Sequence, residues 1–375
     1  MDKLTSKRKK NSGKLLGMRC AAFLILSLSH FFISQSGAQT QTGIYQPGVT
    51  PDGAVYFLPQ TAVRVTVQVE KTTYTPGDFA PYAERFLRLV NVSQEPSTSY
   101  RVLSVKQMAV GVRDTTKAFA VKFNNKSVAV NVALADDGVL LAVNAQPNRL
   151  ELPSAFKPAP KPAAVNPRQF MNEEILAAGS KAKMAQLTAQ EIYDIRDSRS
   201  QLIKGQADFM PKDGEQMKLM LSQLDMQDQA LTSLYAGMTV RDTLEDVFIV
   251  FPSKEVRQQP LFRFSKYLGV VEVDDLSGTP YYINIENLTQ LPATNAEQAA
   301  KKKKAENGLY YNVPGKMKSV ISSGNDIVSE EEYPAAQFGN VELLSGDLFN
   351  KHYGTRLWLN PLTGGIDKLE AEQPK

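Results

Sequence analysis

Apolar positions in the middle of the chain recur every three or four residues, whereas on both sides of this region they alternate with polar positions. The first spacing places small and apolar side chains on one face of an α-helix. In chain order, these positions are Ala178, Ala182, Ala185, Ala189, Ile192, Ile195, Met217, Met220, Leu224, Leu231 and Leu234. Residues 205–211 interrupt the spacing. Residues 169–237 are therefore predicted to form two long antiparallel helices joined by a tight loop, a helical hairpin.

Local signals mark the ends of the predicted helices. Asp213 and Gln216 have the spacing of a capping box, in which side chains bond to the free backbone N–H groups at a helix start. Gly237 follows the last apolar position, and glycine often ends a helix because it adopts the left-handed conformation easily. The first helix is predicted to be the longer one, so we expect it to be kinked near Gly179 and Ser180 or to extend beyond its partner.

The alternating pattern predicts β-strands before and after the helices. Val63, Val65, Val67 and Val69 alternate with polar residues, as in a strand with one buried face. Further strands are predicted at residues 100–112, 117–123, 128–134, 139–143, 243–251, 261–265, 270–273, 281–286, 355–360 and 366–369. The expected fold class is α+β, with antiparallel β-sandwich-like modules and the long antiparallel helical hairpin inserted between them.

Composition divides the chain into successive segments. They are a signal peptide (1–38), a disordered mature N-terminus (39–52), an N-terminal β domain (53–150), a Pro-rich linker (151–168), the helical hairpin (169–237), a β segment (238–292), a Lys-rich linker (293–307), a C-terminal β segment (308–369) and a tail (370–375). The motif Gly53-x-x-Tyr56-x-x-Pro59 recurs as Gly308-x-x-Tyr311-x-x-Pro314. This recurrence favours two related β modules, with coincidence as the alternative.

Residues 1–38 have the three parts of a secretory signal peptide. A basic start precedes the apolar stretch 21–33, and Ser36 and Ala38 supply small residues before a cleavage site. The apolar stretch is shorter than the ~20 residues that span a bilayer, and no later segment is apolar enough to do so. We therefore expect export, cleavage near Ala38, and a location in the periplasm or at the cell surface with no membrane span.

Cleavage changes both the charge and the chemical inventory. The full chain has 43 Lys and Arg and 39 Asp and Glu residues, of which residues 1–38 hold seven and one, so 36 basic and 38 acidic residues remain. This balance argues against a nucleic-acid partner. The remaining chain has no cysteine and one histidine, His352, which excludes disulfides, thiolate nucleophiles and zinc sites with two or more Cys or His ligands. We expect no cofactor and no metal.

Candidate chemistry is limited to carboxylates and one tryptophan. The chain has no phosphate-binding glycine motif and none of the common hydrolase motifs. The acidic groups at 136–137, 173–174 and 330–332 are interpreted as a turn, a helix start and a solvated loop. Asp274 and Asp275 are the first candidates for glycan hydrolysis, which needs two carboxyl groups about 5–9.5 Å apart. Trp358 is interpreted either as a core anchor or as a sugar-stacking surface.

Several segments together resemble a known group of proteins. They are residues 63–74, 178–185, 188–196, 210–216, 261–265 and 274–278. These segments are similar to an uncharacterised family of exported proteins from Bacteroidetes, one of the domains of unknown function, over residues 55–369. The resemblance implies an envelope or secreted location, and it supplies no activity and no catalytic residue.

The leading hypothesis is a non-catalytic interaction or assembly module that binds another envelope protein or a surface polymer through its hairpin. The residues expected at this contact are Ala182, Ala185, Met217 and Met220. A hairpin that only packs within the fold is the simpler alternative. The alternative functions are a carboxylate-dependent glycan hydrolase and a carbohydrate-binding protein. Their candidate residues are Asp274 and Asp275 for hydrolysis, and Trp358, Tyr281 and Tyr282 for carbohydrate binding.

Overall fold

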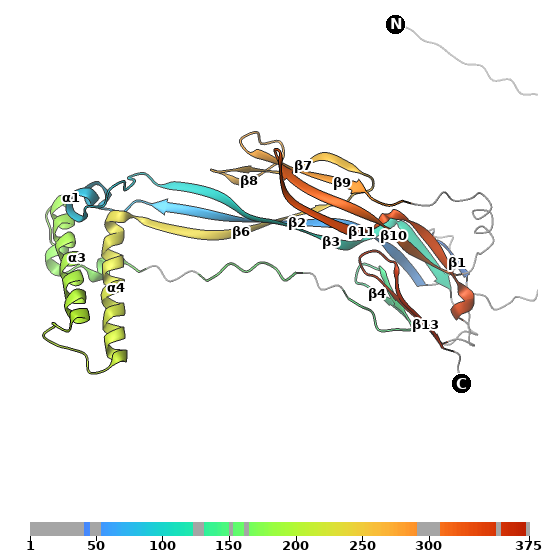
Figure 1. The fold of residues 1–375 in the computed structure, drawn as a ribbon, viewed down its shortest axis with the longest axis horizontal. Coiled ribbons are helices and arrows are strands. Elements are labelled where there is room, and N and C mark those ends of the chain that lie inside the picture. The colour runs from blue at the N-terminus through green and yellow to red at the C-terminus, as the bar shows by residue number, and fades with distance from the viewer. Residues whose placement is uncertain are drawn as a thin grey trace, which may run out of the picture. The chain divides into compact units, whose positions relative to one another are not determined.

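The computed structural model describes residues 41–45, 54–122, 131–149, 153–160, 165–290, 308–349 and 354–372 (Figure 1). Antiparallel β-sheets predominate in these residues and helices are few, which confirms the antiparallel, β-rich part of the predicted fold class. The predicted signal peptide, the Lys-rich linker and His352 lie outside the described residues.

The first sheet is built on two long strands, β2 (Ala54–Thr75) and β3 (Ser97–Lys122), which pair with each other. Strand β1 (Gln41–Ile44) pairs with β3 and strand β6 (Met238–Val250) pairs with β2, so the order is β1-β3-β2-β6. Because β1 lies in the segment 39–52, the disorder expected there does not hold for these four residues. Backbone pairing with β3 orders a polar sequence that no hydrophobic pattern marks.

The second sheet has the order β11-β10-β9-β7-β8, and the third has the order β13-β12-β5-β4. Their strands are β4 (Val132–Leu134), β5 (Leu140–Val143), β7 (Val256–Ser265), β8 (Gly269–Val271), β9 (Thr279–Asn287), β10 (Gly308–Ser323), β11 (Asp326–Ser345), β12 (Gly354–Leu359) and β13 (Ile366–Glu372). Strand β13 includes residues 370–372, which were expected in the tail. Since β12 pairs with β5 and β6 pairs with β2, the regions before and after the helices share two sheets.

Strand β2 contributes to two hydrophobic cores. The alternating valines at 63–69 are buried against the second sheet, beside Phe262 and Ile283, as their period predicted. Earlier on the strand, Tyr56 and Leu58 are buried against the third sheet. Burying one large apolar side chain contributes roughly 1.5–3 kcal/mol. The same strand therefore attaches both of the other sheets to the first.

The two long β-hairpins share one irregularity. In the pair β2/β3, the register shifts where residues 57–59 lie opposite residues 113–118. In the pair β10/β11, it shifts where residues 313–315 lie opposite residues 335–340. Both shifts occur next to the proline of the recurring motif, and in both the second strand holds three extra residues. This agreement supports the prediction that the two hairpins are related modules.

The helices follow β2 and β5 in the chain. They are η1 (Ala80–Tyr82), α1 (Ala83–Leu87), η2 (Pro167–Phe170), α2 (Glu173–Leu176), α3 (Lys181–Lys204) and α4 (Gly214–Ala236), with η3 (Gly346–Phe349) before β12. The Ser180 side chain accepts a hydrogen bond from the Lys183 N–H, so α3 begins there and the longer helix expected from residue 169 is interrupted. Asp213 accepts a bond from the Gln216 N–H, which confirms the predicted N-cap of α4.

Candidate functional site

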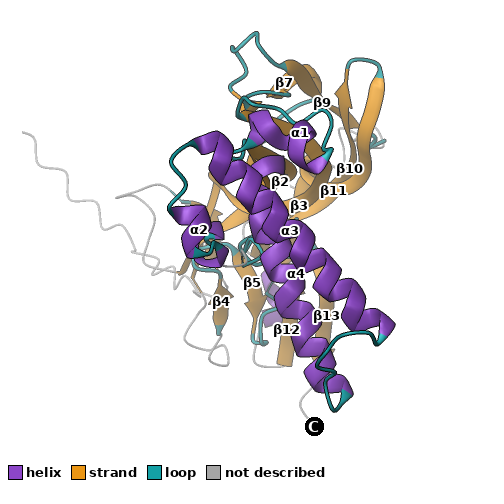
Figure 2. Cartoon of the chain, turned by 90° about the vertical axis from the view of Figure 1, so that its left-hand side faces the viewer, coloured by secondary structure: helices purple, strands orange, loops and turns teal. Residues whose placement is uncertain are grey.

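Helices α3 and α4 lie side by side, and polar pairs fix their register (Figure 2). The Arg196 Nε donates to Asp228 Oδ1 at 2.9 Å, and the Arg199 Nε donates to Asp225 Oδ1 at 2.6 Å. Residue numbers rise on α3 as they fall on α4, so the helices run antiparallel. Ion pairs this exposed contribute about 1 kcal/mol or less each. Their main effect is therefore to select the register of the two helices.

The end of the helical pair nearest β2 is tightly packed. Tyr235 is fully buried, its hydroxyl donates to the Ala185 carbonyl, and its ring lies 5.4 Å from the Phe79 ring. The Phe79 N–H donates to the Leu234 carbonyl at 2.6 Å. A Cβ atom on Gly77 would lie 2.2 Å from that same carbonyl oxygen, so only glycine fits there. The side chains at this end of the pair therefore pack within the fold.

The other end of the pair, near the α3–α4 loop, is open and apolar. A hollow of about 490 Å³ lies there, and we call it the end hollow. Its lining consists of Ser198, Gln201, Leu202, Ala207, Phe209, Leu219, Met220, Gln223 and Leu224. Leu202 at the base is buried, whereas Phe209 and Leu219 at the rim are 62% and 61% exposed. Ile203 and Met210 nearby are also exposed, so apolar surface is concentrated at this end.

The four residues expected at the contact are not brought together. Ala185 is fully buried beside Tyr235, and Ala182 is exposed. Met220 lines the end hollow, and Met217 is half-buried one turn earlier on α4. Because the helices are antiparallel, the two alanines and the two methionines lie at opposite ends of the pair. The helical period identified a face of each helix but did not determine how the two faces align.

Two apolar residues at the end hollow, Phe209 in its lining and Met210 nearby, were missed in the sequence. Phe209 and Met210 stand in the segment that breaks the helical spacing, and they were interpreted only as an interruption. Two large apolar residues before Pro211 are unusual in an exposed loop, and they are the signal that was available.

Asp274 and Asp275 lie in the turn between β8 and β9. Asp275 Oδ1 accepts the Ser277 N–H at 2.9 Å. Hydrogen bonds from Ser277, mainly from its side chain and then from its backbone, lower the pKa of the Asp275 carboxyl. A general acid for glycan hydrolysis needs the opposite shift. Across the described part of the chain, no cluster of three or more Asp, Glu, His or Cys side chains is arranged to hold a metal ion. The Asp275 carboxylate thus stabilises a turn.

The aromatic candidates do not form one stacking surface. Trp358 is half-buried on β12, its Nε1 donates to the Gln146 carbonyl at 3.0 Å, and Lys368 Nζ lies 5.1 Å from the ring centroid. Tyr281 stacks on Phe262 in the core at 4.5 Å between centroids. Tyr282 follows it on β9, so its side chain points to the opposite face of the sheet.

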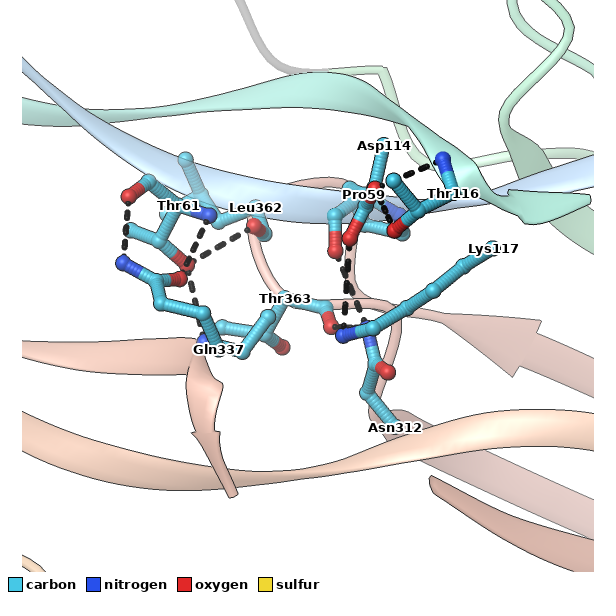
Figure 3. Close-up of polar contacts among 10 residues, drawn as sticks. Pro59, Thr61, Asp114, Thr116, Lys117, Asn312, Gln337, Leu362 and Thr363 are labelled. Carbon is cyan, nitrogen blue, oxygen red and sulfur yellow. Dashed lines mark hydrogen bonds and ion pairs between the residues drawn. The ribbon is translucent and has the colours of Figure 1, made fainter. Parts of the chain in front are cut away.

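A buried polar cluster joins the first two sheets to the turn 360–365 (Figure 3). The Thr61 N–H donates to Gln337 Oε1 at 3.0 Å, and Gln337 Nε2 donates to the Thr61 carbonyl at 2.9 Å. The fully buried Asn312 donates from Nδ2 to the carbonyls of Pro59 and Thr363. These bonds connect β2 with β10, β11 and the turn 360–365. The cluster therefore has the character of a structural junction.

Residues 52–367 match the family model described as "Domain of unknown function (DUF4831)". The chain belongs to this family. The DUF4831 match includes both long β-hairpins and the helices that form the end hollow. No curated protein and no solved structure matches the chain. Among the described helices there is no candidate for a membrane-spanning segment.

Proposed function

We propose that this protein is a non-catalytic interaction or assembly module in which α3 and α4 act as one helical hairpin. In this proposal, a partner protein inserts apolar side chains into the end hollow. The observation that carries the proposal is the combination of a buried apolar base, Leu202, with a rim, Phe209 and Leu219, that is more than half exposed. Interface anchors typically occupy pockets of this kind.

The size of the end hollow and the register of its two helices support this proposal. Its volume of about 490 Å³ lies within the range of ligand-binding pockets, roughly 300–1,000 Å³. The Arg196–Asp228 and Arg199–Asp225 pairs hold the two helices in register on the side of the hollow nearest β2. A pre-formed hollow reduces the entropic cost of binding. Covering the rim would remove large apolar side chains from water, at roughly 1.5–3 kcal/mol each.

The proposal places the protein outside the cytoplasm, in the envelope or at the surface of a bacterium such as a member of the Bacteroidetes. The basic and apolar pattern of residues 1–38, with small residues at Ser36 and Ala38, supports export. The resemblance described above supports the same location. The glycan-hydrolase and carbohydrate-binding alternatives have less support, because Asp275 caps a turn and Tyr281 packs in a core.

Photo-crosslinking in intact cells tests this function. A photoreactive amino acid in place of Leu219 should capture a partner, which mass spectrometry identifies. Leu276 is the matched control, because it is 81% exposed but lies in the β8–β9 turn. Recovery of the same proteins from both positions would show that exposure alone determines capture.

The captured partner, once purified, allows a quantitative test. The double variant Phe209→Ser/Met220→Ser should weaken its binding at least tenfold, or about 1.4 kcal/mol. Leu276→Ser should leave the affinity unchanged. Circular dichroism and the melting temperature establish that both variants are folded. Unchanged affinity in the folded double variant would contradict the proposal.

A further inference from the structure

Strand β6 forms the outer edge of the first sheet (Figure 1). It pairs with β2 from Met238 opposite Thr75 to Val250 opposite Val63, without a register shift. No described strand pairs with its other edge. A regular strand of 13 residues, more than twice the common strand length of about 5–6, thus presents a long edge for pairing.

This edge carries only part of the usual protection against pairing with another chain. Native edge strands are commonly short, or they carry charged side chains (lysine above all), proline or a bulge. Strand β6 is long and has no proline, no lysine and no bulge against β2, and its four charged residues are of both signs. Its apolar side chains Leu244, Val247 and Ile249 are each more than 40% exposed. These features leave the free edge of β6 open to pairing with another strand.

We propose that a second copy of this chain covers the edge, with the two β6 strands antiparallel and Thr243 on the two-fold axis. In this register, Arg241 of each copy lies directly opposite Glu245 of the other, which gives two complementary charge pairs on one face. The pairing would join two four-stranded sheets into one continuous sheet across the axis.

The charges of β6 reject the neighbouring registers. A two-fold axis perpendicular to the sheet pairs residues whose side chains point to the same face. The axis therefore passes midway between the two copies of one residue, and each register is named by that residue. An axis through Arg241, Asp242, Glu245 or Asp246 places that charged residue opposite its own copy. An axis through residue 244 places Asp242 opposite Asp246 twice. Like charges directly opposite each other destabilise strand pairs, so from residue 241 to residue 246 only the axis at Thr243 remains.

Charge reversal in the full chain tests this register. Analytical ultracentrifugation should show a dimer for the unmodified protein. Arg241→Glu and Glu245→Arg should each raise the dimer dissociation constant at least tenfold, because each places two like-charge pairs face to face. The double variant Arg241→Glu/Glu245→Arg should restore dimerisation, since the pairs are complementary again. The double variant is a matched control for Glu245→Arg, because both proteins lose the hydrogen bond from Gln68 Nε2 to Glu245.

Disulfide trapping provides a second measurement that does not depend on charge. With Cys20 replaced by serine, Thr243→Cys should form a disulfide-linked dimer, because opposite Cα atoms in an antiparallel pair are about 4.5–5.5 Å apart. Val247→Cys is the control on the same strand and face. Its two copies would be eight residues apart along the strand, or roughly 26 Å. They should not crosslink.

The proposal is overturned by a monomeric wild-type protein, by single charge variants that dimerise as tightly as the wild type, or by equal crosslinking at positions 243 and 247. A folded double charge variant that remains monomeric also overturns it. The dimer involves β6 and not the end hollow, so these results and the crosslinking at Leu219 are independent of each other.

Discussion

The Tyr56 hydroxyl is bonded to both backbone polar groups of Tyr310, a residue 254 positions later in the chain. It accepts the Tyr310 N–H at 2.8 Å and donates to the Tyr310 carbonyl at 3.3 Å. Tyr56 is fully buried, and burial raises its pKa, so the hydroxyl remains protonated. The contact joins the start of β2 to the start of β10, where the two related motifs lie.

Tyr56→Phe should destabilise the protein by about 1–3 kcal/mol, because the Tyr310 N–H loses its acceptor in a buried setting. The ring and its packing are retained. Denaturation in urea, monitored by circular dichroism, measures the change. Tyr193→Phe is the control, since the Tyr193 hydroxyl bonds to the Phe86 carbonyl at an exposed position. An equal loss of stability in both variants would contradict the importance of the Tyr56 contact.

Gly77→Ala should destabilise the protein by about 1–3 kcal/mol or more, because its Cβ would overlap the Leu234 backbone. Glycine therefore permits the close approach of the turn after β2 to α4. Gly179→Ala is the control, as a Cβ there meets no atom within 4 Å. Thermal unfolding compares the two variants, and a Gly77→Ala protein as stable as the wild type would show that the turn has room to move.

The Lys316–Glu332 pair should make stability depend on pH in the acidic range. A hydrogen bond from Lys316 is the main cause that lowers the pKa of Glu332. A carboxyl group whose pKa is lower in the folded state stabilises that state at pH values above its pKa in the unfolded chain. This contribution is lost as the pH falls through the pKa of the folded state. Glu332→Gln should therefore lower the melting temperature at pH 7, and the difference should vanish near pH ~3.

Glu331→Gln is the matched control for this prediction, because Glu331 neighbours Glu332 on β11 but forms no ion pair among the described contacts. Melting curves at several pH values compare both variants with the wild type. A pH-independent difference for Glu332→Gln would show that the charge pair is not its cause.

The features that could be predicted from the sequence are those with a local signal. The valines at 63–69, the Asp213 cap and the β12–β13 hairpin all agree with the structure, because period, capping and turn residues act over a few positions. Strand β11 was missed, and its acidic residues 330–332 were interpreted as a solvated loop. Glu332 and Glu330 form ion pairs across the strand pair with Lys316 and Lys318, which only the register of β10 and β11 reveals.

The candidate site was predicted in part, for a similar reason. Met220 does line the end hollow, but its neighbours there include Leu202 on the other helix and Phe209 in the loop. Which residues of α3 meet which residues of α4 depends on contacts such as Arg196 with Asp228, over 30 positions apart in the chain. A hydrophobic period carries no information about such pairings.

Strand β2 begins at the Tyr56 contact and ends at the turn packed on α4, so one uninterrupted piece of backbone connects the helices to the third sheet. A pull on the helices by a bound partner would act along this strand. Its ladders with β3 and β6 lie perpendicular to that force, so the hydrogen bonds would share the strain in shear instead of opening one after another. We therefore expect the paired strands β2, β3 and β6 to resist extension along their length.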